Sequence, residues 1–316
     1  MMPHTDWLSH FLNMMTVVGQ LDIHCSYHAP WRLEEPESVA HEMPYHLILS
    51  GSAVVEIPES GESWVLNTGD IVLLPHGMAH ILHDGSRLPP IKSHQRQGEM
   101  GWIVDENEGQ GQRLDMLCGR FIVRAPYDRL MRTYFPSSLI VRSVDAQGSH
   151  ASTLLTGIVD MMRIASASTD IGSHAILNAL SSALFTLVLR TASEAEQVPK
   201  GLLSLAGYPR LAPAISAILT EPAHPWGIAE LAKRCSMSRA TFLRHFKDRL
   251  GVSAMELLTD IRMNLAVSEL KHSAVTTEVV AASVGYQSVS AFRRVFTEKL
   301  GCTPGEWRRL MHRSDH

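Results

Sequence analysis

Two of the four cysteines lie in sequence contexts that favour thiol chemistry. Cys25 lies in the run His24-Cys-Ser-Tyr-His28, and a protonated imidazole near a thiol lowers its pKa and favours the reactive thiolate. Cys118 precedes Gly119 on an expected strand and could act as the resolving partner of an oxidised Cys25. The pair predicts a redox sensor, and the alternative is that Cys118 is a small buried core residue, as free cysteines usually are.

The histidines His46 and His80 form a second pair with chemical potential. Imidazole nitrogens suit zinc, nickel or copper, so a divalent metal could be held here with a third ligand from His24, His83 or His94. The pair could instead anchor a small molecule against apolar strand residues. The sequence therefore leaves three signals open: an oxidant, a metal ion and a small ligand. No catalytic residue is predicted, since no nucleophilic triad, phosphate loop or paired-carboxylate motif is recognisable.

An internal repeat near the C-terminus carries a different chemistry. The segment 231–246 is echoed by 280–296, and the phenylalanine pairs Phe242/Phe246 and Phe292/Phe296 recur 50 residues apart. In each copy a short helix is followed by a turn and by a serine suited to cap a second helix, whose two phenylalanines bury one face. This pattern predicts two helix-turn-helix units, whose second helices can enter two successive major grooves of double-stranded DNA about 34 Å apart.

The exposed face of each second helix supplies the expected DNA contacts. Arginines can bind guanine edges with two hydrogen bonds, small or apolar side chains can meet thymine methyls, and the serines and lysine suit phosphates. The predicted DNA-binding residues are Ser238, Arg239, Ala240, Leu243, Arg244 and Lys247 in the first unit and Ser288, Val289, Ser290, Arg293 and Arg294 in the second.

Other elements must position these groups. Short β-rich runs separated by turns extend from about residue 21 to 141 and predict a sandwich or barrel. Two amphipathic helices are expected between about 151 and 192, either as a dimer seam or as a cap on the barrel's own core. We therefore predict a barrel sensing domain over 1–145, a helical dimerisation or packing segment over 146–192, a linker over 193–207 and a DNA-binding domain over 208–316.

The charge is divided unevenly along the chain. The net formal charge is −4, but residues 201–316 hold 15 Lys and Arg against 10 Asp and Glu, a net of +5, which leaves −9 for the other 200 residues. A basic segment attached to an acidic one is typical of a DNA-binding module on a sensing domain. The cysteines form no CxxC pair, no lysine or arginine precedes Arg32, and no apolar run approaches about 18 residues, which predicts a cytoplasmic protein without membrane contact.

The last hundred residues resemble the AraC family of bacterial transcription regulators. The matching motifs are Ile228-Ala-Glu-Leu-Ala232, Met237-Ser-Arg-Ala-Thr-Phe242, Phe246-Lys247, Val284-Gly-Tyr-Gln-Ser288 and Gly301-Cys-Thr-Pro-Gly-Glu-Trp307. The resemblance implies a bipartite all-α DNA-binding domain joined by a long helix at about 254–271. It implies base contacts by Ala240, Leu243 and Arg244 and by Val289, Ser290, Arg293 and Arg294, with RNA polymerase and a second copy of the chain as further partners.

The N-terminal part resembles a cupin barrel. The run Gly69-Asp-Ile-Val-Leu-Leu-Pro75-His-Gly77-Met-Ala-His80 matches the second cupin motif, but the first is degenerate, with Pro44 where a glutamate is expected. The missing ligands weaken both metal binding and the alternative function, a metal-dependent cupin enzyme. A branch that resembles reactive-chlorine sensors places cysteines as Cys25 and Cys118 are placed, which favours redox control of a DNA-binding regulator.

Overall fold

The chain forms two compact units in the computed structural model, residues 16–199 and residues 200–316 together with 1–15. The structure describes residues 6–98, 102–124, 126–142, 150–168, 170–195, 198–206, 208–271 and 275–314.

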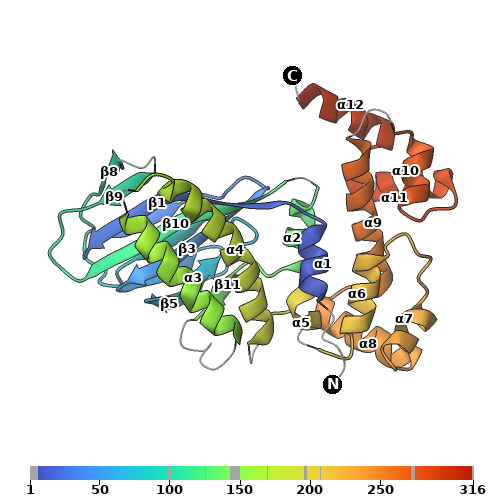
Figure 1. The fold of residues 1–316 in the computed structure, drawn as a ribbon, viewed down its shortest axis with the longest axis horizontal. Coiled ribbons are helices and arrows are strands. Elements are labelled where there is room, and N and C mark those ends of the chain that lie inside the picture. Colours follow the sequence, from blue (N-terminus) through green and yellow to red (C-terminus); the bar gives the residue numbers. More distant parts are fainter. Residues whose placement is uncertain are drawn as a thin grey trace. The chain divides into compact units, whose positions relative to one another are not determined.

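The unit of residues 16–199 is built on two β-sheets (Figure 1). In the larger sheet the strand order is β11-β6-β3-β10-β1-β9-β8, and in the smaller one it is β2-β7-β4-β5. The strands are β1 (Val17–His28), β2 (Arg32–Glu35), β3 (Glu42–Ser50), β4 (Ser52–Ile57), β5 (Glu62–Asn67), β6 (Ile71–Leu73), β7 (His80–His83), β8 (His94–Gln97), β9 (Ile103–Glu106), β10 (Arg113–Val123) and β11 (Leu139–Val141).

An apolar core lies between the two sheets. Burial alternates along β4 because successive strand side chains point to opposite faces. The core combines residues of both sheets, among them Tyr27, Ile48, Val55, Leu82 and Met116, and it includes both Cys25 and Cys118. The predicted sensor cysteines are therefore interior side chains.

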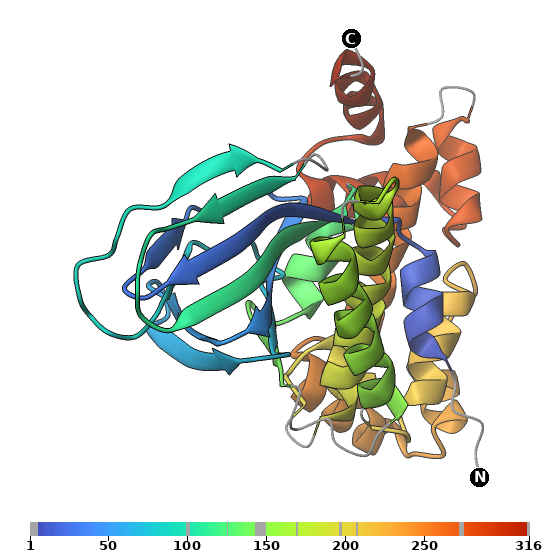
Figure 2. The same ribbon diagram turned by 60° about the vertical axis from the view of Figure 1, so that its left-hand side comes forward.

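Helices α3 (His150–Ala167) and α4 (Ser173–Glu194) lie side by side over the large sheet, as both ribbon views show (Figures 1 and 2). Helix α4 lies directly on β1, where a Cβ on Gly19 would come within 2.4 Å of the Ser182 backbone nitrogen. The Tyr45 hydroxyl of β3 and the Ser181 hydroxyl of α4 are 2.7 Å apart. By length and composition helix α4 could also cross a membrane. This is weak evidence for a membrane span, because Leu177, Leu184 and its other buried residues pack inside this unit.

The other unit is helical. Its elements are α1 (Trp7–Asn13), α5 (Leu202–Ala206), α6 (Ala212–Thr220), α7 (Ile228–Arg234), α8 (Arg239–Leu250), α9 (Ala254–Leu270), α10 (Thr277–Ser283), α11 (Val289–Leu300) and α12 (Pro304–Ser314), with α2 (Asp128–Tyr134) belonging to the sheet unit. The pairs α7–α8 and α10–α11 are the predicted repeat, and α9 joins them. The predicted two-domain class, a cupin-like β domain followed by amphipathic helices and an all-α double helix-turn-helix domain, is confirmed.

Helix α1 belongs to the helical unit, whereas the sequence predicts residues 1–145 as one barrel domain. Trp7, Leu8 and Phe11 are buried, and the helix packs on α6. The apolar side of α1 explains why this short helix joins the helical unit, because that side must be covered by other apolar side chains. The predicted limit near residue 145 falls in 143–149, outside the described residues, and the linker 193–207 is described except at 196, 197 and 207.

Candidate sensor site and DNA interface

Four predicted sensor residues meet in the core of the sheet unit. Cys25 of β1, Cys118 of β10 and His46 of β3 come from three neighbouring strands, and His80 begins β7 of the other sheet. The Sγ atoms of Cys25 and Cys118 are 3.6 Å apart. His46 Nδ1 lies 3.0 Å from Cys118 Sγ, and His46 Nε2 lies 2.7 Å from His80 Nε2. The four side chains thus form one continuous row of contacts.

The carbonyl of Met78 determines the direction of these hydrogen bonds. A carbonyl only accepts, so His80 Nδ1 carries the hydrogen of the 2.9 Å bond between them. In neutral imidazoles His46 Nε2 then donates to His80 Nε2, and His46 Nδ1 accepts from the Cys118 thiol. Cys118 Sγ is left to accept from the Cys25 thiol.

Burial keeps both imidazoles neutral. Burial first, and then the neighbouring His80, hold the pKa of His46 well below its usual range. Burial also lowers the pKa of His80, although its bond to the Met78 carbonyl opposes this. The pKa of Cys118 is raised well above its usual value, first by the hydrogen bond with Cys25 and then by burial. His46, His80 and Cys118 are therefore uncharged near neutral pH, with a base, His46, already in contact with a thiol.

The histidines next to Cys25 in the sequence do not contribute in the expected way. Because strand side chains alternate between faces, His24 points away from the core that holds Cys25. Burial lowers the pKa of His24, so a positive charge there is disfavoured. The expectation that a protonated His24 activates Cys25 is therefore wrong. The imidazole that contacts a sensor thiol is His46, and the thiol is Cys118.

The arrangement does not fit a metal ion. Two nitrogens bound to one tetrahedral zinc at about 2.05 Å would lie about 3.3 Å apart, whereas the facing nitrogens of His46 and His80 are separated by 2.7 Å and bond to each other. His83 pairs with Glu56 at 3.2 Å, and His94 pairs with Glu106 at 3.5 Å. In the described part of the chain, no three His, Cys, Asp or Glu side chains are grouped so as to hold a metal.

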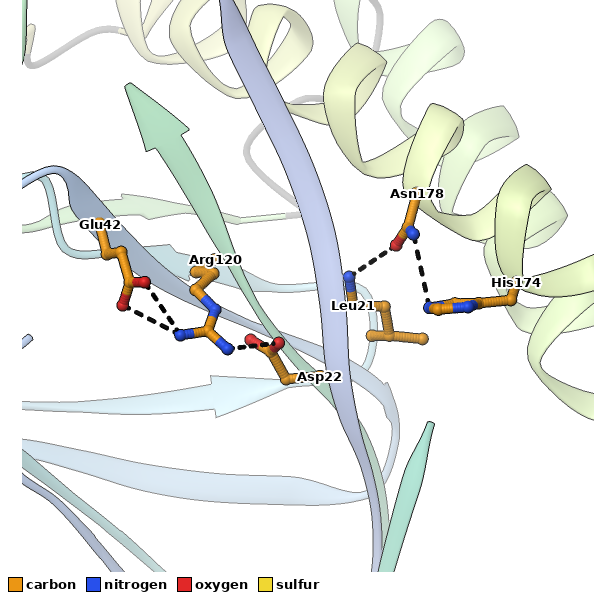
Figure 3. A network of polar contacts seen from close by, with 6 residues as sticks. All are labelled: Leu21, Asp22, Glu42, Arg120, His174 and Asn178. Atoms are coloured by element: carbon orange, nitrogen blue, oxygen red, sulfur yellow. Dashed lines mark hydrogen bonds and ion pairs between the residues drawn. The ribbon is translucent and has the colours of Figure 1, made fainter. Parts of the chain in front are cut away.

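The strand of Cys25 is connected to helix α4 through two of its backbone amides. The pairing of β1 with β10 is irregular between Leu21 and Ile23, a β-bulge that interrupts the ladder. The Leu21 N–H donates to Asn178 Oδ1 at 2.9 Å, and the Gly19 N–H donates to the Ser182 hydroxyl at 2.9 Å. Figure 3 shows the first of these bonds together with the contact of Asn178 and His174.

The bulge also places a charged cluster beside β1 (Figure 3). Arg120 Nη2 donates to Asp22 at 2.9 Å, and Arg120 Nη1 donates to both oxygens of Glu42 at 3.0 Å. Burial raises the pKa of Asp22, and Arg120 opposes that rise. The cluster joins β1, β10 and β3 at the bulge, so a shift of β1 relative to β10 must disturb both it and the α4 bonds. Asn178 and Ser182 lie more than 150 residues from their partners in β1, so no local sequence pattern predicts these contacts.

The predicted DNA-binding residues lie at the start and on the exposed faces of α8 and α11. The hydroxyls of Ser238 and Ser288 accept from the backbone N–H of Thr241 and Ala291, as expected of N-caps. The phenylalanines of each helix are buried, and the predicted contact residues are exposed except Val289, which is half-buried. Arg293 Nη2 donates to Glu278 at 3.2 Å in an exposed ion pair. The structure thus leaves these side chains accessible, and their DNA contacts stay a prediction.

Comparison with known proteins extends over both units. A cupin family model matches residues 6–194, and a helix-turn-helix domain model matches residues 231–310. An uncharacterised HTH-type transcriptional regulator of Haemophilus influenzae is 29% identical over 309 residues, covering 96% of this chain and 98% of the relative. The RCS-specific HTH-type transcriptional activator RclR of Escherichia coli is 30% identical over 303 residues, 96% of this chain and 97% of RclR. The regulator MtrA of Neisseria gonorrhoeae is 27% identical over 307 residues, 96% of this chain and 98% of MtrA.

A cupin domain joined to paired helix-turn-helix units defines a DNA-binding transcription regulator that is controlled by a signal at its N-terminal domain. The chain belongs to the AraC-type family of helix-turn-helix regulators with a cupin domain. Since these relatives are named as regulators, the chain is a regulator and not the metal-dependent cupin enzyme considered as the alternative.

Proposed function

We propose that this regulator is controlled by oxidation of Cys25 and Cys118 to a disulfide. The observation that carries the proposal is the placement of the two buried thiols 3.6 Å apart, with His46 in contact with Cys118. RclR is named as RCS-specific, and reactive chlorine species are the oxidants that we propose for this chain. The metal and small-ligand hypotheses have less support, because the nitrogens of His46 and His80 already bond to each other and to their neighbours.

The chemistry needs one molecule of hypochlorous acid. The sulfur of Cys118 takes the chlorine from hypochlorous acid and becomes a sulfenyl chloride, and hydroxide is displaced. His46 accepts the proton of the Cys118 thiol and passes it to this hydroxide, so that water is formed. Cys25 sulfur then attacks Cys118 sulfur, chloride leaves, and the Cys25 proton is released as the S–S bond forms. Two electrons pass from the sulfur pair to chlorine. Cys118 is attacked first because it alone contacts a base and is 6% exposed, against 0% for Cys25.

Disulfide formation must move β1 relative to β10. The sulfurs have to approach from 3.6 Å to about 2 Å, and the bulge between Leu21 and Ile23 is the place where the ladder is least constrained. The backbone amides of Gly19 and Leu21 would then shift against Ser182 and Asn178 of α4. A signal alters DNA occupancy only by a difference in free energy between two states, and these two hydrogen bonds provide such a difference.

The test measures DNA binding by the purified full chain. We expect specific binding to its own promoter region over a scrambled duplex at physiological salt, and a change in that binding after one equivalent of hypochlorous acid. A reductant should reverse the change, because a disulfide is reversible and the higher sulfur oxides are not. Specific binding that stays the same after oxidation would refute redox control, whereas equal binding to both duplexes would contradict sequence-specific recognition.

His46 is predicted to set the rate of oxidation. His46→Gln keeps one acceptor and one donor but cannot take up a proton, so we expect disulfide formation to slow by about 100-fold. Because the pKa of His46 lies well below its usual range, the neutral base is present on both sides of about pH 6.5, and the wild-type rate should show no decline there. Quenched-flow alkylation followed by mass spectrometry measures these rates. His24→Gln on the opposite face is the matched control, and equal rates for wild type and His46→Gln would exclude His46 as the base.

We further propose that the chain is a homodimer through α3 and α4. The inner face of α3 is buried, whereas Leu154, Met161 and Ile164 form an exposed apolar stripe along its outer face. Ile176 of α4 is also about half exposed. Large apolar side chains spaced two turns apart on an outer helix face are suited to the same face of a second copy.

Charge on this stripe is expected to separate the dimer. Ile164→Glu would place a carboxylate in an apolar interface, and we expect the dissociation constant of the dimer to rise at least about tenfold. Light scattering after size-exclusion chromatography measures the mass as a function of concentration. Thr156→Glu adds the same charge on an exposed side of α3 away from the stripe and should leave the dimer intact. Dimers of equal strength in both variants would place the interface elsewhere.

The chain binds DNA, and we propose the residues that contact the DNA and the protein partners as follows. Base and phosphate contacts are assigned to the exposed residues of α8 and α11, with the two helices in adjacent major grooves. RNA polymerase is the expected partner of an activator, the role named for RclR. A DNA partner and four free thiols favour a reducing cytoplasm. The domain limits drawn from the sequence, with α1 assigned instead to the helical unit, are part of this proposal.

A further inference from the structure

The two helix-turn-helix units pack on successive parts of the same helix, α9. The first unit contacts it through α8 and is preceded by α6, which also touches α9. The second unit packs on the later part, where Met263, Ala266, Val267 and Leu270 meet the phenylalanines of α11. Something besides these separate contacts must determine how one unit is oriented toward the other.

Arg262 of α9 links the loop that precedes the first unit to the turn of the second unit. Its Nε donates to the Pro222 carbonyl at 2.7 Å, and its Nη2 donates to the His224 carbonyl at 2.8 Å. Both carbonyls belong to the loop between α6 and α7, which leads into the first unit. The same guanidinium lies over the ring of Tyr286, 5.6 Å from its centroid, in the turn between α10 and α11 of the second unit.

The same loop and turn also touch directly. Gly285 has φ +85°, and a Cβ there would lie 2.3 Å from the Ala223 carbonyl oxygen. The turn therefore needs glycine both for its left-handed backbone and for its close approach to the loop. The loop is braced on its other side by Trp226, whose Nε1 donates to the Glu221 carbonyl at 2.8 Å and whose ring lies under Arg234.

The chemistry of this contact suits arginine. A planar guanidinium can donate in two directions while its face lies on an aromatic ring, whereas a lysine ammonium cannot do both. Arg262 is half-buried, and its two hydrogen-bond partners are neutral carbonyls held by backbone geometry. A charge-assisted hydrogen bond is stronger than a neutral one, so this is a stiff link between loop, α9 and turn.

We propose that Arg262 is a positioning residue that locks the two helix-turn-helix units into one geometry and so determines the spacing between the two DNA sites they bind. α8 and α11 then meet the DNA as a single rigid body. Successive major grooves repeat at about 34 Å, so a rigid pair of recognition helices accepts one spacing and rejects its neighbours. Without the lock, each unit can bind its own site while the spacing between sites varies.

The test compares spacing preference among variants of the full chain. The probes are the footprinted segment of its own promoter and duplexes with one or two base pairs inserted between the two protected sites. Each inserted pair lengthens the separation by 3.4 Å and rotates the second site by about 35°. We expect two inserted base pairs to weaken wild-type binding at least about tenfold. The same insertion should weaken Arg262→Ala binding less than about threefold. On the natural spacing, Arg262→Ala should bind more weakly than the wild type.

Arg249→Ala is the matched control. Arg249 also donates to a backbone carbonyl, that of Ser204, and lies 4.1 Å from the ring centroid of Tyr208, but unlike Tyr286 neither partner belongs to the second unit. This variant should keep the wild-type spacing penalty. If Arg262→Ala weakens binding but retains that penalty, Arg262 supports the fold only and the proposal fails. Thermal melts report folding, and if the alanine variant unfolds, Arg262→Lys must show the reduced penalty.

Discussion

Loss of the oxidant response in both Cys25→Ala and Cys118→Ala is the largest effect expected of any substitution in the sensing domain. A disulfide needs both sulfurs, so either variant should show the same DNA affinity before and after hypochlorous acid. Each change removes one small buried side chain at a cost of roughly 1–2 kcal/mol, which leaves the unoxidised fold in place. Fluorescence anisotropy on the promoter duplex measures the affinity, and the intact mass reports about 2 Da lost when the wild-type disulfide forms.

Cys235→Ala provides the control for this experiment. Cys235 is a buried thiol at the end of α7 in the helical unit, and it is not part of the row of contacts formed by Cys25, Cys118, His46 and His80. This variant should lose the 2 Da and change its DNA affinity as the wild type does. A full response in Cys118→Ala would show that another thiol is the sensor. A disulfide that forms without any change in affinity would show that oxidation is not the signal.

Arg294→Ala is expected to cause the largest loss of specific DNA affinity. Arg294 is exposed on α11, on the face opposite the buried Phe292 and Phe296. An arginine that binds a guanine edge with two hydrogen bonds contributes about 1–3 kcal/mol of discrimination, so binding to the promoter should fall by roughly 5- to 160-fold. Binding to the scrambled duplex should change much less.

Lys247→Ala distinguishes base contact from general attraction. Lys247 is exposed near the end of α8 and is assigned to a phosphate, so its loss should weaken promoter and scrambled duplexes alike. The slope of log affinity against log salt should fall by about 1. Salt titrations of both variants on both duplexes make the comparison. If Arg294→Ala weakened the two duplexes equally, Arg294 would be a phosphate contact and specificity would reside elsewhere.

Local patterns were sufficient for the DNA-binding part of the molecule. The paired phenylalanines four residues apart and the capping serines Ser238 and Ser288 act within one or two helical turns, so their spacing alone predicts which face is buried and where each helix begins. The exposed face of each recognition helix follows from the position of its buried face. For the same reason the strands and the change to helical periodicity near residue 151 could be predicted, although the placement of α1 with the helical unit could not.

The sensor site depended on tertiary structure. Cys25 and Cys118 were predicted from their sequence contexts, but the expected influence of His24 on Cys25 was wrong, because neighbours along a strand point to opposite faces. The contact of His46 with Cys118 depends on the register of β10 against β3, and that of the two cysteines on a bulge in β1. Arg262 likewise has no local pattern, since its partners lie about 40 residues before it and 24 residues after it. Helix spacing and caps are short-range properties that the chain encodes locally, whereas strand register and loop-to-helix contacts are decided only when distant segments pack together.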